Sequence, residues 1–210
     1  MTDYIESLQW RYATKKYDPD KKVSDQDLET LKEAVRLSVS SMGLQPYKVL
    51  IVENPEVRRL LREASNNQAA ITEASHVFVF ANETNVGHSH IENYLDNIIR
   101  TREVSRESLA PFSNSMHSFI ESQTEDSKNF WTSKQAYLAM SSLINAAAVL
   151  HIDATPMEGF NRAAVNEVLG LDKIGLSAAV IATIGYRHKD DRFQHLKKVR
   201  KSKDELFITI

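Results

Sequence analysis

The sequence contains no cysteine, and this absence excludes several kinds of site at once. Disulfides, thiolate zinc centres, iron–sulfur clusters and cysteine nucleophiles all need a thiol. Only 6 glycines are present, and neither G-x-G-x-x-G nor G-x-x-x-x-G-K-[ST] occurs. If this chain binds a phosphate group, basic side chains must do so in place of a glycine-rich loop.

Long hydrophobic runs are missing too. No stretch reaches the roughly 18 apolar residues that a membrane span needs. The start, MTDYIESLQW, lacks the basic residues and apolar core of a signal peptide. The net charge of -2 gives no overall attraction to nucleic acid or to an acidic membrane. We therefore expect a cytoplasmic protein that binds neither membranes nor nucleic acid.

The composition is that of an ordinary globular protein. Of the 210 residues, 42% are apolar and 26% are charged. We expect residues 1–210 to form a single domain, with a polar, helical and exposed excursion around residues 85–125 that Pro111 breaks.

Positive charge is unevenly distributed along the chain. Residues 187–203 contain eight Lys or Arg against two Asp, and a second basic cluster, RYATKK, occupies residues 11–16. Such runs are most often solvated surface. Two basic segments that converge in the fold could also form a socket for an anion, and the sequence leaves both interpretations open.

Residue patterns predict a mixed α/β chain. Strands are expected at residues 47–53, 76–82 and 177–186, which are rich in β-branched and aromatic residues. Helices are expected at residues 1–10 (capped by Thr2 or Asp3), after Ser24 (with Asp27 as a capping-box partner), at 55–73, at 126–150, and between Asn161 and Gly170. A loop is expected to start at Thr155-Pro156, and the last five residues, LFITI, are apolar enough to form an edge strand.

The helix expected at residues 126–150 is unusual. Its second half, AYLAMSSLINAAAVL, is apolar on nearly every face. A helix of this kind must be buried all round. We therefore expect it either in the middle of the core or at a subunit interface.

Three polar stretches have both a structural and a ligand-binding interpretation. SVSSMGLQP (38–46) and SNNQAA (65–70) supply hydroxyls and amides that could cap helices or hydrogen-bond a polar ring. In TPMEGF (155–160), Glu158 could be a solvated loop acid. Because Gly159 permits close approach of the backbone, the main-chain amides could instead contact a flat ring.

Other chemistry finds little support. His88 and His90 are two residues apart, which places them on different faces of a helix. Since no H-E-x-x-H motif is present, we expect no metal site. No serine lies in a G-x-S-x-G setting, so a hydrolase triad is not expected either.

Taken in order, these stretches resemble the FMN-dependent nitroreductase family. R-Y-A-T-K resembles its opening R-x-S-x-K, and S-V-S-S-M-G-L-Q-P, N-N-Q with A-S-H-V-F-V-F, P-M-E-G-F and K-K-V-R follow in register from about residue 9 to 201. The likeness is greatest to the oxygen-insensitive NAD(P)H nitroreductase and dihydropteridine reductase branch. It implies an α+β sandwich, with a central, mainly antiparallel sheet flanked by helices, in an intertwined homodimer.

The resemblance also implies an FMN site made of five groups of residues. These are the phosphate ligands Arg11, Lys198 and Arg200; Tyr12, Ala13 and Lys15 along the cofactor; Ser40, Ser41 and Gln45, acting across the dimer interface; Asn67 and Gln68 at the ribityl or pyrimidine edge; and Pro156, Met157, Glu158 and Gly159 over one face of the ring. The lysine would lie near the pyrimidine end, where a fixed cation favours hydride acceptance because reduced flavin is negatively charged there.

This chain departs from the family at three positions. Gly43 stands where the branch often has asparagine, Ala70 where some members carry a second lysine, and Ala13 where the motif has serine. The departures affect contacts at the pyrimidine edge rather than the phosphate site.

The implied activity is ping-pong hydride transfer from NADH or NADPH, through flavin N5, to nitroaromatics, quinones or related electron-poor small molecules. The cofactor carries this chemistry, so no protein acid or base is assigned. Phe112, Phe119 or Phe130 could cover the substrate or could be structural. The alternatives are a flavin, dihydropteridine or enone reductase on the same fold, and a non-redox module whose basic tail binds a nucleotide or RNA.

Overall fold

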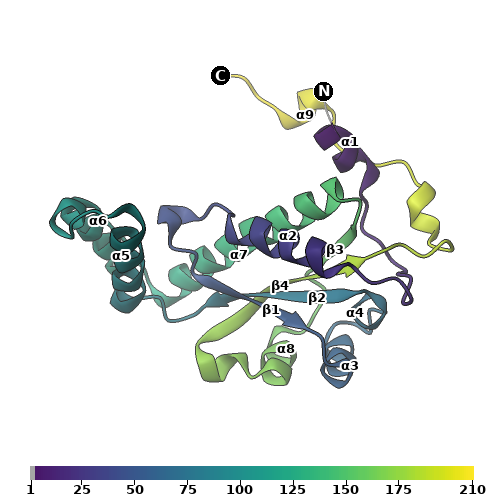
Figure 1. Cartoon of the computed structure of the whole chain (residues 1–210), viewed down its shortest axis with the longest axis horizontal. Coiled ribbons are helices and arrows are strands. Elements are labelled where there is room, and N and C mark those ends of the chain that lie inside the picture. Colours follow the sequence, from purple (N-terminus) through teal and green to yellow (C-terminus); the bar gives the residue numbers. More distant parts are fainter. Residues whose placement is uncertain (1–2) are drawn as a thin grey trace.

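Four strands form one antiparallel sheet in the computed structural model, which describes residues 3–210 (Figure 1). The strands are β1 (Tyr47–Val52), β2 (His76–Glu83), β3 (Asp153–Met157) and β4 (Leu176–Gly185), and their order in the sheet is β1-β2-β4-β3. Each neighbouring pair is antiparallel. The expected α+β class with an antiparallel central sheet is confirmed.

Helices surround the sheet. They are α1 (Asp3–Trp10), α2 (Asp25–Arg36), α3 (Pro55–Ala64), α4 (Ala70–Glu73), α5 (His88–Arg102), α6 (Ala110–Glu121), α7 (Glu125–Val149), α8 (Arg162–Leu169) and α9 (Lys203–Leu206). Five of those in the described residues (α2, α3, α4, α7 and α8) pack on its two faces. Short 3₁₀ turns occur at Ser41–Gly43, Glu107–Leu109, Leu171–Ile174 and Arg192–His195. The caps expected at Ser24, Asn161 and Gly170 are present. The cap expected at Thr2 lies outside the described residues.

Strand β2 shows how the two layers of the core arise. Successive side chains of a strand point to opposite faces. Phe78 and Phe80 accordingly join the cluster beneath α2 and α7, whereas Val77 and Val79 join the cluster beneath α3, α4 and α8. Figure 1 shows α2 and α7 on one side of the sheet and α3, α4 and α8 on the other. Because helices cover both faces of the sheet, the sequence of β2 is a nearly continuous run of apolar residues.

Helix α7 is buried along only part of its circumference. Ala136, Ala139 and Leu143 are fully buried, but Leu138 is 42% exposed and Val149 is 52% exposed. Of the two settings expected for this helix, the middle of the core of a single chain does not hold for its whole circumference, and the subunit interface stays a prediction. No helix in the described part of the chain combines the length and apolarity that crossing a bilayer requires.

Helices α5 and α6 form a lobe beyond the end of the sheet, at the left of Figure 1. The lobe was expected to be an exposed excursion, but it encloses an apolar cluster of its own, which includes Ile91, Leu95, Met116 and Ile120. Pro111 lies in the first turn of α6 and so begins a helix there. This fits its fixed φ and missing N–H group.

Two predictions for β structure were wrong. Residues 153–157 form strand β3, where a loop was expected to begin at Thr155. Pro156 hid this strand, but β3 lies at the edge of the sheet, where a proline is tolerated. At the C-terminus, Leu206 ends α9 and residues 207–210 form no strand, because they extend away from every sheet edge of their own chain.

The helix expected over residues 55–73 is interrupted. Asn66 and Asn67 both have a positive φ, at 51° and 54°, so the chain leaves the α conformation between α3 and α4. Asparagine tolerates this left-handed region better than most residues. The break places an amide-rich turn at the end of α3.

Arg58 is a buried cation that ties α3 to the end of α4. Its Nε donates to the carbonyl oxygen of Ile71 (2.7 Å), and its two terminal nitrogens donate to the carbonyls of Ala74 (2.5 Å) and Ser75 (3.3 Å). Burial lowers the pKa of Arg58. One guanidinium thus satisfies carbonyls at the end of α4, which would otherwise lack partners.

We expect Arg58→Met to lower the free energy of unfolding by about 2–3 kcal/mol, because three carbonyls lose a charged donor while the apolar stem is kept. Arg59→Met is the matched control. Arg59 lies on the exposed side of the same helix, in pairs with Glu56 and Glu63, and such pairs contribute about 0–1 kcal/mol. Urea denaturation of both variants measures the difference. Equal losses would mean that Arg58 has no special role.

Candidate functional site

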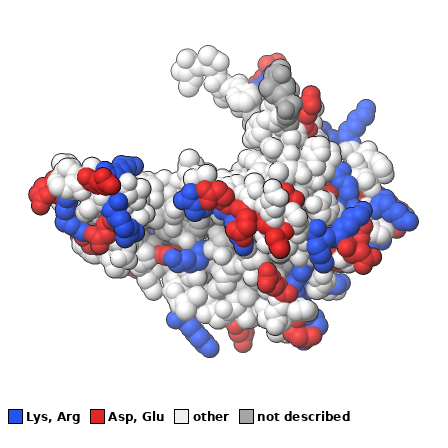
Figure 2. Space-filling view, viewed as in Figure 1, with Lys and Arg blue, Asp and Glu red and all other residues white. Residues whose placement is uncertain are grey.

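The two basic segments of the sequence converge on one cavity of about 320 Å³. One wall consists of Gln9 to Ala13 with Lys15, and the other includes Phe193, Lys197, Lys198 and Arg200. Figure 2 shows blue Lys and Arg side chains, with some red acidic ones among them, along the right flank of the molecule, below the two ends of the chain. The convergence that the sequence left open therefore occurs.

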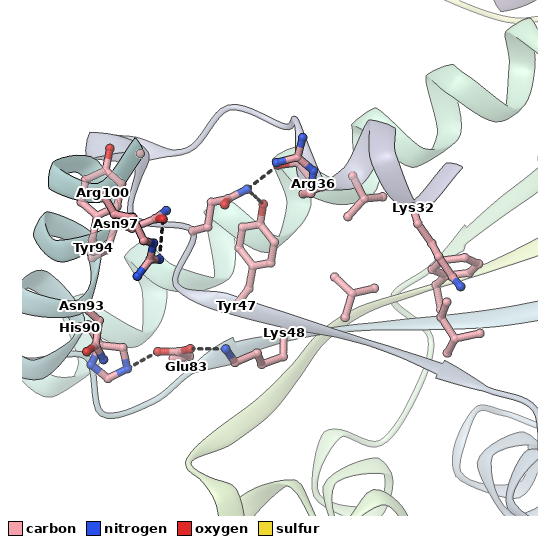
Figure 3. Close-up of a pocket in the computed structure, with 17 residues that line it drawn as sticks. Lys32, Arg36, Tyr47, Lys48, Glu83, His90, Asn93, Tyr94, Asn97 and Arg100 are labelled. Carbon is pink, nitrogen blue, oxygen red and sulfur yellow. Dashed lines mark hydrogen bonds and ion pairs between the residues drawn. The ribbon is translucent and has the colours of Figure 1, made fainter. Parts of the chain in front are cut away.

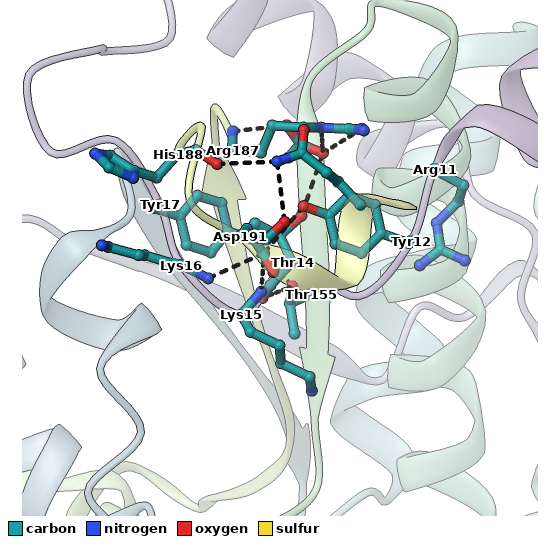
Figure 4. Close-up of polar contacts among 12 residues, drawn as sticks. Arg11, Tyr12, Thr14, Lys15, Lys16, Tyr17, Thr155, Arg187, His188 and Asp191 are labelled. Atoms are coloured by element: carbon teal, nitrogen blue, oxygen red, sulfur yellow. Dashed lines mark hydrogen bonds and ion pairs between the residues drawn. The ribbon is translucent and has the colours of Figure 1, made fainter. Parts of the chain in front are cut away.

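Asp191 joins the two segments (Figure 4). Its Oδ2 accepts hydrogen bonds from the hydroxyl of Tyr12 (2.9 Å) and from the main-chain N–H groups of Lys15 (2.7 Å) and Lys16 (3.1 Å). Its Oδ1 accepts from the N–H of Phe193 (3.0 Å). Burial alone would raise the pKa of Asp191, but these donors outweigh it and hold the pKa below its usual value. The carboxylate thus fixes the backbone that carries Lys15.

Three cations line the cavity, and none of them forms an ion pair with an acid of the described cavity wall. Arg11, Lys198 and Arg200 line it, and none of the described residues that line it is acidic. Burial lowers the pKa of Arg11 and of Lys198, and repulsion from Arg200 lowers both further. Lys198 Nζ also donates to the carbonyl oxygen of Arg11. Asp153 attracts Arg11 only as a smaller effect, so repulsion among cations that have no acid in the described cavity wall points to an anion site.

An unpaired donor supports the same conclusion. The Nε of Arg11 is buried and has no hydrogen-bond partner in the described chain. A buried, unpaired donor is costly, so it is expected to find a partner when the site is filled. The residues present therefore fit a phosphate group, with two guanidinium groups and an ammonium as donors.

We expect Asp191→Asn to lower the free energy of unfolding by about 1–3 kcal/mol at pH 7, because an amide replaces a charged acceptor of four donors. The pKa of Asp191 is depressed in the folded chain. Its contribution is therefore present above the unfolded pKa of about 3.9 and is lost as the pH falls through the folded value. Unfolding curves of the two proteins should approach each other below about pH 4. A difference that is independent of pH would refute this role.

The segment that begins at Arg11 lies along β3 and leads to a second group of predicted residues. The hydroxyl of Thr155 donates to the carbonyl of Thr14 (2.8 Å). Just beyond the end of β3, the carbonyl of Gly159 accepts from the side-chain amides of Asn66 (3.1 Å) and Gln68 (3.0 Å). A Cβ at Gly159 would lie 3.2 Å from the Asn66 amide, so glycine suits this close approach.

The side chains around this turn differ in direction. Tyr137 of α7 donates to Oε1 of Glu158 (2.7 Å), and burial with this contact raises the pKa of Tyr137 to about 12. Met157 is buried in the core, so only its backbone is available to a ligand, whereas Pro156 is partly exposed. The amide oxygen of Asn67 accepts from Arg62 Nε (2.8 Å), so Asn67 turns away from Gly159, unlike Gln68.

The serine loop lies elsewhere in the chain. Gln45 lines a separate cavity of about 850 Å³ between α2, β1 and α5, together with Tyr47 and Tyr94 (Figure 3). Ser40 accepts from the N–H of Gln45 (3.0 Å), and the N–H of Ser41 donates to Gln135 of α7 (2.8 Å). One chain therefore does not bring these three residues to the cavity lined by Arg11.

Two of the departures from the family have a structural reason. Gly43 has a φ of +74°, and a Cβ there would lie 2.2 Å from the Tyr94 hydroxyl, so Tyr94 occupies the space that a side chain would need. Ala70 is 6% exposed and packs in the core, where a lysine would have to bury its charge. The third, Ala13, lines the basic cavity.

The three candidate aromatic residues are placed differently. Phe119 packs edge-on against Trp131, with ring centroids 5.3 Å apart, and is part of the lobe's apolar cluster. Phe112 is 38% exposed and Phe130 is 66% exposed, so both remain candidates to cover a substrate. Sequence reasoning missed Asp191 and Tyr137. For Asp191, the only signal in the sequence was its position as an acid within a basic run. For Tyr137, the sequence contained no signal.

Comparison with known proteins agrees with this arrangement. The model of the nitroreductase family matches residues 8–186. The chain belongs to this family. A relative named "Putative NAD(P)H nitroreductase" from Staphylococcus epidermidis is 34% identical, over 98% of this chain and 96% of its own length. The major NAD(P)H-flavin oxidoreductase of Aliivibrio fischeri is 33% identical, over 98% and 97%.

A solved structure shows that the nitroreductase fold extends over the whole chain. A protein of Exiguobacterium sibiricum, described as a nitroreductase in complex with FMN, superposes with a TM-score of 0.85 and 18% identity, covering 100% of this chain and 98% of its own. At this identity the likeness concerns the fold. The nitroreductase-like architecture expected from the sequence is confirmed.

Proposed function

We propose that residues 1–210 form a single FMN-binding domain that works as an NAD(P)H-dependent oxidoreductase. The observation that carries this proposal is the cavity in which Arg11, Lys198 and Arg200 meet without an acidic partner. Membership of the nitroreductase family supports it, as does the relative named as an NAD(P)H-flavin oxidoreductase.

In this proposal, Arg11, Lys198 and Arg200 hold the phosphate of the cofactor. The bound flavin supplies the chemistry, which is acceptance of a hydride from NADH or NADPH and its delivery to an acceptor. Asp191 fixes the main chain of Lys15, so that the ammonium can stand beside the pyrimidine end and stabilise negative charge there. Tyr12 and Ala13 line the path between these two ends.

The turn after β3 would cover the ring. Tyr137 holds the carboxylate of Glu158, and Asn66 and Gln68 hold the carbonyl of Gly159. The N–H groups of Glu158 and Gly159 would then face the ring, whereas the N–H of Phe160 donates to the carbonyl of Glu158 (2.9 Å). Asn67 would need to leave Arg62 in order to contact the cofactor.

We further propose an intertwined homodimer in which the serine loop of one chain completes the FMN site of the other. Ser40, Ser41 and Gln45 lie away from the basic cavity of their own chain. The exposed side of α7, with Leu138 and Val149, provides an apolar surface for such contact. Sedimentation of the holoprotein should then give a dimer, and a monomer that retains FMN would refute this arrangement.

Nitroaromatics, quinones and related electron-poor small molecules are the proposed acceptors. Free flavin is the second candidate, because the relative from Aliivibrio fischeri is named as a flavin oxidoreductase. A steady-state comparison of a nitroaromatic, a quinone and free FMN as acceptors distinguishes the two.

The test of the proposed function is the visible spectrum of the purified chain before and after NADH or NADPH is added without air. A yellow protein that bleaches is the expected result. A colourless protein that shows no spectral or fluorescence change with added FMN would overturn the proposal. The basic cavity would then need another ligand.

A further inference from the structure

The lobe formed by α5 and α6 contains a cluster of histidine and carboxylate side chains outside the proposed FMN site. Each of the two helices carries a histidine followed four residues later by a glutamate: His88 and Glu92 on α5, and His117 and Glu121 on α6. Residues four apart lie on the same face of a helix. Each helix therefore presents one His/Glu pair.

The two pairs face each other across the lobe. His88 Nε2 lies 3.0 Å from Oε1 of Glu121, and His117 Nε2 lies 3.1 Å from Oε1 of Glu92. The imidazole rings stack with centroids 4.4 Å apart. One ligand atom each from His88, His117 and Glu121 lies within 4.8 Å of those of the other two. An ion with bonds of about 2.0–2.2 Å can bridge such a group after small side-chain rotations.

The second ring nitrogen of His117 gives an independent indication of a ligand. The Nδ1 atom is buried and has no hydrogen-bond partner in the described chain. Glu92 occupies the other nitrogen, and Arg106 in turn donates to Oε2 of Glu92 (2.5 Å). A carboxylate beside Nε2 keeps the proton on that atom and leaves the lone pair on Nδ1. Metal-bound histidines commonly have this outer carboxylate partner.

We propose that His88, His117 and Glu121 bind one divalent transition metal ion, for which zinc is the best candidate, and that the ion clamps α5 to α6. Two imidazoles and a carboxylate form a nitrogen- and oxygen-ligand set that suits zinc and does not suit calcium or magnesium. Water would fill the fourth position.

The fold explains why residue spacing alone did not indicate this site. His88 and His90 lie two residues apart on α5, and their side chains diverge from each other. His90 accepts from the N–H of Gly87 through Nδ1 (3.3 Å) and contacts Glu83 through Nε2. The partner of His88 comes from α6 instead. Both helices are anchored by the apolar cluster around Ile91 and Met116, which brings the two His/Glu pairs together.

The test is calorimetric titration of zinc into the tag-free, metal-free chain, with His88→Gln and Glu121→Gln as the deciding variants. Both side chains are mostly exposed, at 66% and 59%, so both variants are expected to fold. We expect one zinc per wild-type chain, a higher melting temperature with zinc, and at least tenfold weaker binding in each variant. His117→Gln should lose binding as well.

His90→Gln is the matched control, since it removes a histidine of the same helix whose nitrogens both have protein partners. It should bind zinc as tightly as the wild type. Absence of zinc binding by the wild type would overturn the proposal, and so would unchanged binding in His88→Gln and Glu121→Gln. Neither readout needs bound flavin, so this test and that of the FMN site can fail separately.

Discussion

Replacing Arg200 with alanine is expected to weaken FMN binding by about 10- to 100-fold, which corresponds to losing one charged hydrogen bond of about 1.5–3 kcal/mol. Arg200 is exposed, and within the described chain its Nη1 donates to the carbonyl of the preceding residue, Val199. It also repels Arg11 and Lys198. Without the cofactor, its removal should therefore leave the free energy of unfolding within about 0.5 kcal/mol of the wild type.

Fluorescence titration of the apoprotein with FMN measures this effect. Lys201→Ala is the control, because Lys201 is the next residue, is exposed, and does not line the cavity. Arg11→Ala should cost more than Arg200→Ala, since the buried Nε of Arg11 lacks any partner in the described chain. Unchanged FMN affinity in Arg200→Ala would remove the C-terminal segment from the site.

The largest effect on stability is expected from Asp153→Ala. Asp153 is 2% exposed, and it accepts hydrogen bonds from Thr14 (3.2 Å) and from both the main chain (2.8 Å) and the side chain (3.0 Å) of Arg187. The guanidinium of Arg187 lies between the rings of Trp10 (4.2 Å) and Tyr12 (4.6 Å). Removing the acid leaves this cation largely buried and unpaired, which costs about 3–5 kcal/mol.

Thermal and urea unfolding check this prediction, with Asp190→Ala as the control at an exposed acid near Lys16 and His188. The control should stay within about 0.5 kcal/mol of the wild type. The double variant Asp153→Ala with Arg187→Met should recover part of the loss, because it no longer buries an unpaired charge. If Asp153→Ala alone were as stable as the control, the pair would not hold the N-terminal segment to β3.

The sequence predicted what depends on local chemistry. Three strands were found because β-branched and aromatic residues crowd them, and the caps at Ser24 and Asn161 were found because their side chains bond their own helices. Strand β3 was missed because Asp153 and Pro156 are poor strand formers. The strand forms because it pairs with β4 and because Asp153 forms an ion pair with Arg187. Both are tertiary contacts, which local sequence patterns do not reveal.

The same distinction between local sequence patterns and tertiary contacts applies to the candidate site. Charge counting found both basic segments, and the resemblance to the family gave their order. The orientation of Asn67, the burial of Met157 and the position of Asp191 between the segments all depend on contacts between residues far apart in the chain. A one-dimensional pattern contains no such distances, so these features could be found only in the fold.

The contact between Lys198 and Arg11 spans 187 residues of the chain, and this separation has a consequence for biosynthesis. A nascent chain makes the N-terminal wall of the basic cavity first, and Lys198 of the opposite wall follows 187 residues later. A ribosome-bound chain that stops short of Lys198 therefore has only one wall of the anion site. A ligand held between the two walls is bound after the second segment has been made, rather than by a shorter nascent chain.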